Sequence, residues 1–207
     1  MFRKLFLIYI LFAAVTSGSA GQIRIRLFAG QNPESVFINI NEGRYEIDAY
    51  DGHFSYLTAG ESVIITLFRD KLAVKTRKGR GFICDSLIMT GTTGNDSFIC
   101  RKNGADPVQR LYSGDLQCFT DLDVLLMINI CDMEKYIAGV VKAEGGTGKN
   151  IEYFKSQAVL VRTYLYDNMD RHSMDNYNLC DETHCQAYHG YTGDPVISKA
   201  AEETKGL

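Results

Sequence analysis

The spacing of the apolar residues changes its period near residue 130, and this change limits the chain to folds that join a β-rich part to a helical part. Between residues 22 and 130, apolar and polar residues alternate in short runs, as in residues 35–40, and turn-forming pairs such as Asp51-Gly52 separate the runs. Alternation with frequent turns is typical of antiparallel β-structure. Residues 123–130 are almost wholly apolar, which indicates a strand buried on both faces, although their periodicity does not exclude a helix.

Helical spacing follows residue 130. Residues 133–142 place apolar side chains three and four positions apart behind Asp132, a typical N-cap residue. Residues 151–170 do the same behind Asn150, so they are predicted to form a second helix. Its buried stripe is expected to comprise Ile151, Phe154, Ala158, Val161 and Leu165.

A third helix is predicted to begin at Asp194-Pro195 and to end at Gly206. The order of the elements predicts an α+β fold. We expect a β-rich region over residues 21–110, followed by a mixed, mainly helical region over residues 111–207.

Residues 1–20 have the three parts of a secretory signal peptide. Arg3 and Lys4 precede an apolar run over residues 5–15, and the small residues Gly18 and Ala20 stand where a peptidase would need them. The apolar run is shorter than the roughly 20 residues of a membrane-spanning helix, so an uncleaved anchor is the less favoured alternative. We expect an exported protein, periplasmic, secreted or held in the cell envelope, with no integral membrane span after cleavage.

The charge balance argues against nucleic acid as a partner. The chain has 22 basic and 25 acidic residues, and residues 1–20 hold two of the basic residues and no acidic one, so the net charge falls from −3 to −5 on cleavage. Binding to phosphates needs a basic face that releases counterions. We therefore expect no nucleic-acid partner.

Cysteine and histidine residues gather near the carboxyl end. Cys180, His184 and Cys185 lie close together, and His172 precedes them. Thiolate and imidazole are ligands that Zn²⁺ prefers, which makes these residues candidate metal ligands. His184 and Cys185 can both ligate only if the backbone bends between them. The alternatives are a Cys180–Cys185 disulfide, which suits an exported protein, and a helix-end cation role for His172.

The remaining four cysteines are Cys84, Cys100, Cys118 and Cys131. Six cysteines in a chain of 207 residues are too few for a scaffold held mainly by disulfides. Cys84 and Cys100 are candidates for a disulfide across a loop, and the pairing of the others stays open.

Glu144 is the candidate general acid. It ends an apolar helical stretch and precedes Gly145-Gly146, a loop that leaves space above the carboxyl. Desolvation at such a place would raise the pKa of a carboxyl group and let it donate a proton. The alternative is an ordinary solvated glutamate at a helix end, which the local sequence by itself favours.

Three segments of the sequence match one known family, and they follow one another in the order typical of that family. The first runs from residue 132 to residue 141 and is followed by Glu144, the second covers residues 154–164, and the third covers residues 177–190. Residues 200–206 continue the pattern. Together these segments resemble the stage II sporulation protein D and LytB family (SpoIID), over roughly residues 111–207 and only in a general way before that.

The resemblance implies a peptidoglycan lytic transglycosylase. Such an enzyme cleaves the β-1,4 bond between N-acetylmuramic acid and N-acetylglucosamine in peptide-free glycan strands and leaves a 1,6-anhydro ring. The resemblance places the single acid/base on Glu144. It also implies a structural zinc ion on Cys180 and Cys185, with His184 and His172 nearby.

The resemblance further implies where a glycan strand would bind. The expected contacts are Gln157, Arg162, Tyr177, Gln186 and Tyr188. Arg162 would either contact a sugar or orient a carboxylate, and the tyrosine rings would either stack on sugars or pack in the core.

The chain also departs from the family pattern. It ends at Leu207, before a Ser- and Gly-rich segment that family members use in the substrate cleft, so we expect a domain truncated at its carboxyl end. The rival hypothesis is a non-catalytic module that keeps the zinc loop, binds the cell wall and enhances a cell-wall amidase as its partner.

Overall fold

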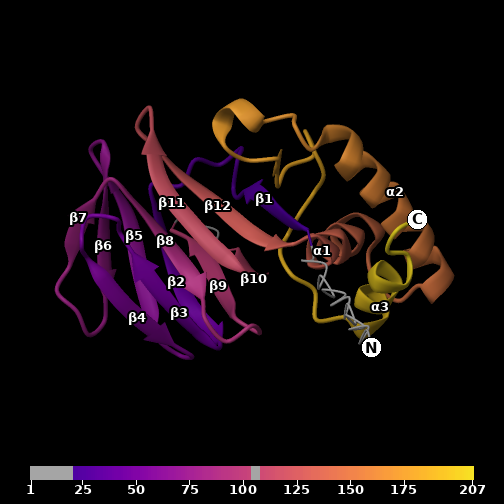
Figure 1. Cartoon of the computed structure of the whole chain (residues 1–207), viewed down its shortest axis with the longest axis horizontal. Helices are drawn as coiled ribbons and strands as arrows, with labels where there is room; N and C mark the ends of the chain where they lie inside the picture. Colours follow the sequence, from indigo (N-terminus) through magenta and orange to yellow (C-terminus); the bar gives the residue numbers. More distant parts are fainter. Residues whose placement is uncertain (1–20, 104–107) are drawn as a thin grey trace, which may run out of the picture.

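The computed structural model describes residues 21–103 and 108–207, which form two β-sheets followed by three helices (Figure 1). The strands occupy one side of the molecule and the helices the other, so the predicted α+β fold, β-rich first and helical afterwards, is confirmed. The predicted signal peptide of residues 1–20 lies outside the described residues.

The first sheet has seven strands. In sheet order they are β13 (Leu179–Cys180), β1 (Gln22–Arg26), β12 (Val124–Asp132), β11 (Asp115–Asp121), β8 (Ser86–Gly91), β3 (Arg44–Asp48) and β4 (Phe54–Thr58). Neighbours are antiparallel except β1 and β13, which run parallel with Ile25 opposite Leu179. A segment from the carboxyl end of the chain therefore completes the sheet beside its first strand.

The second sheet has six antiparallel strands. In sheet order they are β10 (Gln109–Ser113), β9 (Ser97–Lys102), β2 (Ser35–Glu42), β5 (Ser62–Phe68), β6 (Lys71–Thr76) and β7 (Phe82–Cys84). Both sheets contribute to one apolar core, in which Tyr45 of β3 meets Phe98 of β9 edge to face with ring centroids 5.7 Å apart.

The apolar pattern of each element explains its burial. Strands with period-two sequences bury every second residue, as β1 does with Ile23 and Ile25. In β12 all residues from Leu125 to Asn129 are buried, so the prediction of a strand covered on both faces is confirmed. Strand β12 leads directly into the first helix and thus joins the sheets to the helical part.

The three helices are α1 (Met133–Gly145), α2 (Ile151–Asn168) and α3 (Pro195–Glu203). Their predicted N-caps are confirmed, because the side chains of Asp132, Asn150 and Asp194 each accept backbone N–H bonds of the first turn. The predicted end of α3 is wrong. Its C-cap is Thr204, which donates its N–H to the Ala201 carbonyl, and Gly206 lies in the following turn with φ of 84°.

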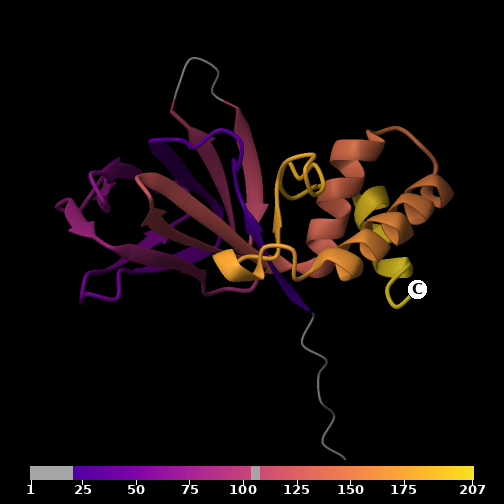
Figure 2. The same cartoon turned by 90° about the horizontal axis from the view of Figure 1, so that it is seen from above.

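The helices pack on one another beside the sheets (Figure 2). The chain returns from the end of α2 through a short 3₁₀ helix, η1 (Ser173–Asp175), to β13 at the edge of the first sheet. This return brings residues 172–185 next to β1. None of the helices in the described part of the chain is both long and apolar enough to cross a lipid bilayer.

All six cysteines are free thiols. The candidate disulfide between Cys84 and Cys100 is absent from residues 21–103. Cys84 lies in β7 and Cys100 in β9, and three strands of the second sheet lie between them. Cys84, Cys100, Cys118 and Cys131 are instead buried as small apolar side chains of the core.

Candidate metal centre and adjoining carboxylate

Four residues predicted as metal ligands come together beside the edge of the first sheet. His172 precedes η1, Cys180 ends β13, and His184 and Cys185 lie in the turn that follows. One ligand atom of each residue lies within 4.8 Å of the others. The Cys185 N–H donates to the Glu182 carbonyl at 2.9 Å, and this turn supplies the bend that His184 and Cys185 need to face one point.

The donor atoms fit a tetrahedral zinc site. Sγ of Cys185 lies 3.4 Å from Nε2 of His172 and 3.6 Å from Nδ1 of His184, and Sγ of Cys180 lies 3.8 Å from the same Nδ1. Zinc bonds of about 2.3 Å to sulfur and about 2.0 Å to nitrogen at tetrahedral angles place S and N about 3.5 Å apart. Two thiols and two imidazoles at these separations form a donor set suited to Zn²⁺.

The surroundings of the cluster affect its protonation. Burial, assisted by His184 and by the charge of Arg171, lowers the pKa of His172 and favours the neutral imidazole that a metal needs. Burial raises the pKa of the Cys185 thiol to about 11. A metal ion would therefore displace a proton from this thiol on binding.

The structure shows neither of the two alternatives for these residues, a Cys180–Cys185 disulfide and a helix-end position for His172. Cys180 and Cys185 are free thiols, not a disulfide. Helix α2 ends at Asn168, so His172 lies beyond its last turn and instead stacks on Tyr177 with ring centroids 4.7 Å apart.

Asp181 anchors the cluster to the segment that follows β1. The sequence did not reveal this role. Its buried carboxylate accepts the N–H groups of Phe28 and Ala29 at 2.7 and 3.0 Å and pairs with Arg110 at 2.8 Å. Burial raises the pKa of this carboxyl, although each of these three interactions by itself lowers it. Its position between Cys180 and Glu182 was visible in the sequence, but its partners are about 70 and 150 residues away.

Glu144 lies at the carboxyl end of α1 and is exposed, so the expected desolvation of its side chain is wrong for this structure. Its Oε1 accepts the N–H of Ala187 at 3.0 Å. Ala187 follows the cluster by two residues, so residues 180–187, here called the metal loop because they include three of the candidate ligands, are joined to the candidate acid by a direct hydrogen bond. Among the described residues, no hydrogen bond reaches Oε2 of Glu144.

A close approach of the chain to α1 makes this bond possible. Residues 188–190 cross α1 at Gly139, where an added Cβ would lie 2.5 Å from both the Gly190 carbonyl oxygen and the Tyr188 ring. No other residue type fits there without displacing the backbone. Gly139 therefore sets how near the segment that follows the metal loop can come to the helix that carries Glu144.

Gln157, a predicted substrate contact, lies beside Gly145, the residue that follows the candidate acid. A Cβ on Gly145 would meet its Cγ at 3.8 Å and the Tyr153 ring at 3.4 Å. Gln157 is half-buried and Tyr153 is 37% exposed, so both side chains reach the surface near the carboxyl end of α1. The sequence did not single out Tyr153, although its place one turn before Gln157 on the same helix was readable.

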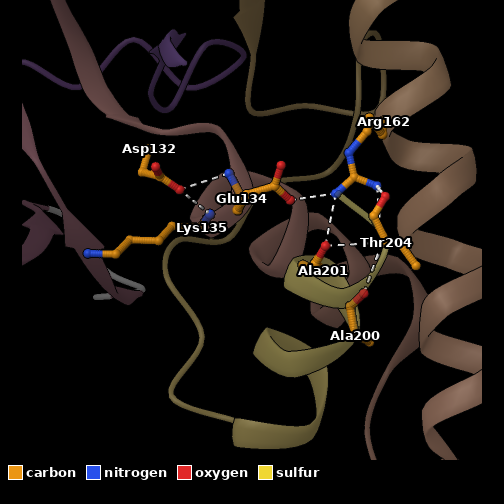
Figure 3. Close-up of polar contacts among 7 residues, drawn as sticks. All are labelled: Asp132, Glu134, Lys135, Arg162, Ala200, Ala201 and Thr204. Carbon is orange, nitrogen blue, oxygen red and sulfur yellow. Dashed lines mark hydrogen bonds and ion pairs between the residues drawn. The ribbon is translucent and has the colours of Figure 1, made fainter. Parts of the chain in front are cut away.

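Arg162 has a structural role instead of the expected contact with sugar. It is 2% exposed, and its Nη2 pairs with Oε2 of Glu134 at 2.5 Å (Figure 3). The guanidinium also donates to the carbonyls of Ala201 and Thr204 at 3.0 and 2.9 Å. The predicted option of orienting a carboxylate is the one realised, with Glu134 as that carboxylate, and these bonds tie α1, α2 and the end of α3 together.

Three further predicted sugar contacts are buried. Tyr188 is fully enclosed, and Gln186 accepts a hydrogen bond from the Tyr136 hydroxyl at 3.2 Å. Tyr177 is 5% exposed because one of its faces stacks on His172. Side chains enclosed in this way cannot form the flat exposed platforms that sugars require, so packing is their main role.

One comparison with known proteins found a match, in the carboxyl-terminal part of the chain. Residues 123–207 match the model of the SpoIID family, described as stage II sporulation protein. The matched region starts at β12 and contains all three helices, the metal cluster and Glu144. No curated protein and no solved structure matches the chain.

Proposed function

We propose that this chain, whose residues 123–207 match the model of the SpoIID family, is a cell-wall enzyme that cleaves peptidoglycan glycan strands as a lytic transglycosylase. The observation that carries the proposal is the position of Glu144. Its carboxyl is exposed, is held through Oε1 by the Ala187 N–H, and has an oxygen without a partner among the described residues. A carboxyl fixed at one oxygen and open at the other is arranged to exchange a proton with a ligand.

One carboxyl group suffices for the proposed reaction. Protonated Glu144 donates its proton to the oxygen that links N-acetylmuramic acid to N-acetylglucosamine, and the bond from that oxygen to muramyl C1 breaks. The carboxylate then takes the proton of the muramyl C6 hydroxyl, whose oxygen bonds to C1 and closes the 1,6-anhydro ring. Glu144 ends protonated again, so the reaction consumes no water and needs no second carboxylate, unlike the usual hydrolysis of a glycoside.

Two side chains beside Gly145, the residue that follows Glu144, could bind a strand. Tyr153 offers a partly exposed ring, and Gln157 offers an amide that can donate to and accept from sugar hydroxyls. A strand lying over these residues would exclude bulk water from the site of proton transfer.

We assign His172, Cys180, His184 and Cys185 as the residues that would hold a zinc ion. When bound, the ion supplies structural cross-linking, because all four protein ligands fill a closed tetrahedral shell. The loop that it would fix continues within two residues to Ala187, the donor to Glu144. The cluster is therefore proposed to position the acid and not to take part in proton transfer.

The proposed substrate fits an exported protein. We propose that residues 1–20 direct the chain out of the cytoplasm, to the periplasm, the cell envelope or the medium, where glycan strands are found.

The deciding experiment incubates the purified, zinc-supplemented protein with peptide-free glycan strands and analyses the products by mass spectrometry. Products that end in 1,6-anhydromuramic acid are expected, and Glu144→Gln should lower their rate of formation by about 10²- to 10⁴-fold. Glu202→Gln is the matched control, because Glu202 is an exposed helical glutamate of α3 and should keep full activity.

Two results would contradict the proposal. Equal product formation by Glu144→Gln and the unchanged protein would remove Glu144 from catalysis. A folded, metal-loaded protein that binds strands without forming products would favour the rival, a non-catalytic module that binds the wall or enhances an amidase.

A further inference from the structure

Strand β4 is an uncovered edge of the first sheet, in the part of the molecule remote from the helices (Figure 1). The other three sheet edges are short or covered. β13 and β7 have two and three residues, and in β10 the Leu111 carbonyl accepts the Tyr191 N–H at 2.6 Å. β4 has five residues, and among the described residues its one neighbouring strand is β3.

β4 also lacks the residues that usually keep an edge strand from pairing. Its sequence, Phe-Ser-Tyr-Leu-Thr, contains no charged residue and no proline. Natural edge strands are normally blocked by charged residues, proline or bulges. Phe54 and Tyr56 are 50% and 47% exposed and lie edge to face with ring centroids 4.8 Å apart. A strand of this kind is suited to pairing with another extended chain.

The backbone of β4 presents free hydrogen-bonding groups at this edge. Directly before the strand, the Ala49 N–H donates to the His53 carbonyl at 3.1 Å. Since bonded and non-bonded pairs alternate along antiparallel strands, the register with β3 turns the N–H and C=O groups of Phe54 and Tyr56 away from β3. The next group in this series, the Thr58 N–H, donates to a glutamate carboxylate of the following turn at 2.9 Å. No other segment in the described part of the chain bonds to the backbone of Phe54 or Tyr56, so these groups are available to a partner.

A cleft lies beside this edge. It has a volume of about 680 Å³, and we call it the edge cleft. One wall is formed by residues 55–62, which include most of β4, and the other by residues 76–79 of the turn between β6 and β7. Its size falls within the range of binding pockets. The edge of β4 therefore opens into a space that can hold a ligand.

The second wall of the edge cleft is positively charged. It belongs to residues 69–80, which contain six basic residues and one acidic residue in a chain whose formal net charge is −3. Lys78 pairs with Glu61. Arg77 lines the cleft, is exposed, and forms no ion pair with any described residue. Its guanidinium is free to bind a carboxylate through two N–H groups.

We propose that β4 binds an extended, acidic segment of another protein as an added strand. The backbone groups of Phe54 and Tyr56 supply the main-chain hydrogen bonds, and their exposed rings contact apolar side chains on one face of the added strand. Arg77, which follows a strand of the facing sheet, binds an acidic side chain on the other face. The proposal does not depend on the proposed function, because residues 54–80 lie outside the matched residues 123–207.

The charges decide between this partner and a second copy of the chain. β4 of a second copy has no acidic residue, so as an added strand it does not match the basic wall of the edge cleft. An acidic segment matches that wall, and like charges across an interface are unfavourable.

The test uses the capped, fluorophore-labelled peptide Gly-Val-Glu-Val-Glu-Val-Glu-Gly and follows its binding to the full-length protein by fluorescence anisotropy at low ionic strength. A control peptide carries lysine in place of every glutamate. Two further peptides carry N-methyl groups on all valines or on all glutamates. Successive residues of a strand direct their N–H groups to opposite edges, so only one of these two sets faces β4. We expect the lysine peptide and one of the methylated peptides to bind about tenfold more weakly, whereas the other methylated peptide keeps its affinity.

Hydrogen exchange followed by NMR locates the peptide. With free peptide at about ten times its Kd, exchange of the Phe54 and Tyr56 amides should slow about tenfold. The amides of Ser55 and Leu57 already face β3, so their exchange should not change. Protection of alternate residues in one strand is the signature of an added strand.

Arg77→Gln should weaken binding of the acidic peptide by about two- to fivefold, the range of an exposed ion pair. It should leave unchanged the binding of a peptide with glutamine at the glutamate positions. Arg80→Gln is the matched control, because Arg80 lies in the same turn, is exposed, and does not line the edge cleft. Both substitutions are on the surface and should keep the fold.

Three results would overturn the proposal. The first is an equal effect of the two methylated peptides. The second is binding of polyphosphate, an anion without a peptide backbone, as tight as that of the acidic peptide, which would show a general polyanion surface. The third is protection of Phe54 and Tyr56 that rises with protein concentration in the absence of peptide, which would assign the edge to a second copy.

Discussion

The two ends of α1 carry glutamates in opposite circumstances. Glu134, in the first turn, is 6% exposed and pairs at 2.5 Å with Arg162, itself fixed by carbonyls of Ala201 and Thr204. Glu144, in the last turn, is exposed and receives one hydrogen bond, from the Ala187 N–H. The same residue type on one helix thus serves packing at one end and is available for chemistry at the other.

The difference lies in burial and in the charge of the partner, because each of the two carboxylates has one oxygen bonded within the described residues. A buried carboxylate must have its charge compensated inside the protein, and Glu134 achieves this with a guanidinium. An exposed carboxyl can leave one oxygen to water until a ligand takes its place. The contrast predicts that charge removal at Glu134 acts on folding, whereas charge removal at Glu144 acts on turnover.

Glu134→Gln should have the largest effect on folding. It would leave the Arg162 guanidinium, 2% exposed, without a carboxylate, and breaking such a pair costs about 3–5 kcal/mol. Urea unfolding monitored by circular dichroism measures this loss. The double variant Glu134→Leu with Arg162→Met removes both charges and should be much less destabilised than the single variant. If the double variant is as unstable as the single one, packing and not charge explains the effect.

Metal removal should have the next largest effect. At a free zinc concentration of 100 times the dissociation constant, bound zinc adds about 2.7 kcal/mol to the free energy of unfolding. A chelator that removes the zinc is expected to remove this contribution. For a chain of this length that corresponds to roughly 5–10 °C in Tm. Calorimetry with and without chelator measures the shift. Cys185→Ser removes one ligand, so its Tm should not respond to the chelator. An equal response in both proteins would place the metal elsewhere.

Loss of the α1 N-cap should cost less. Asp132 accepts the N–H groups of Glu134 and Lys135 at 2.9 and 3.1 Å, and Asp132→Ala should lower the free energy of unfolding by about 1 kcal/mol. Asp132→Asn keeps an accepting oxygen and is the matched control. Because the cap lies at the end of α1 opposite Glu144, activity per folded molecule should stay unchanged. A loss of activity in a fully folded Asp132→Ala would show that the two ends of the helix are coupled.

The periodic parts of the molecule were predictable from the sequence, and the tertiary partners were not. Alternation in β1 and three- and four-residue spacing in α2 follow from local geometry, as do the caps at Asp132 and Asn150. The metal ligands were predicted as a group because three of them are close in sequence. The burial of Tyr188 and Arg162 depends on segments far along the chain, which residue type alone does not reveal.

The smallest predicted change in stability belongs to Glu144→Gln. The side chain is exposed, and a glutamine Oε1 can accept the Ala187 N–H as the carboxylate does, so the free energy of unfolding should change by less than about 0.5 kcal/mol. Denaturation of this variant beside Glu134→Gln compares one chemical change at both ends of one helix. A loss above about 1 kcal/mol at Glu144 would mean that its charge holds the metal loop in place. In that case, lost product formation would be explained by a displaced loop. If stability is unchanged and product formation is lost, the loss is explained by the missing acidic proton of Glu144.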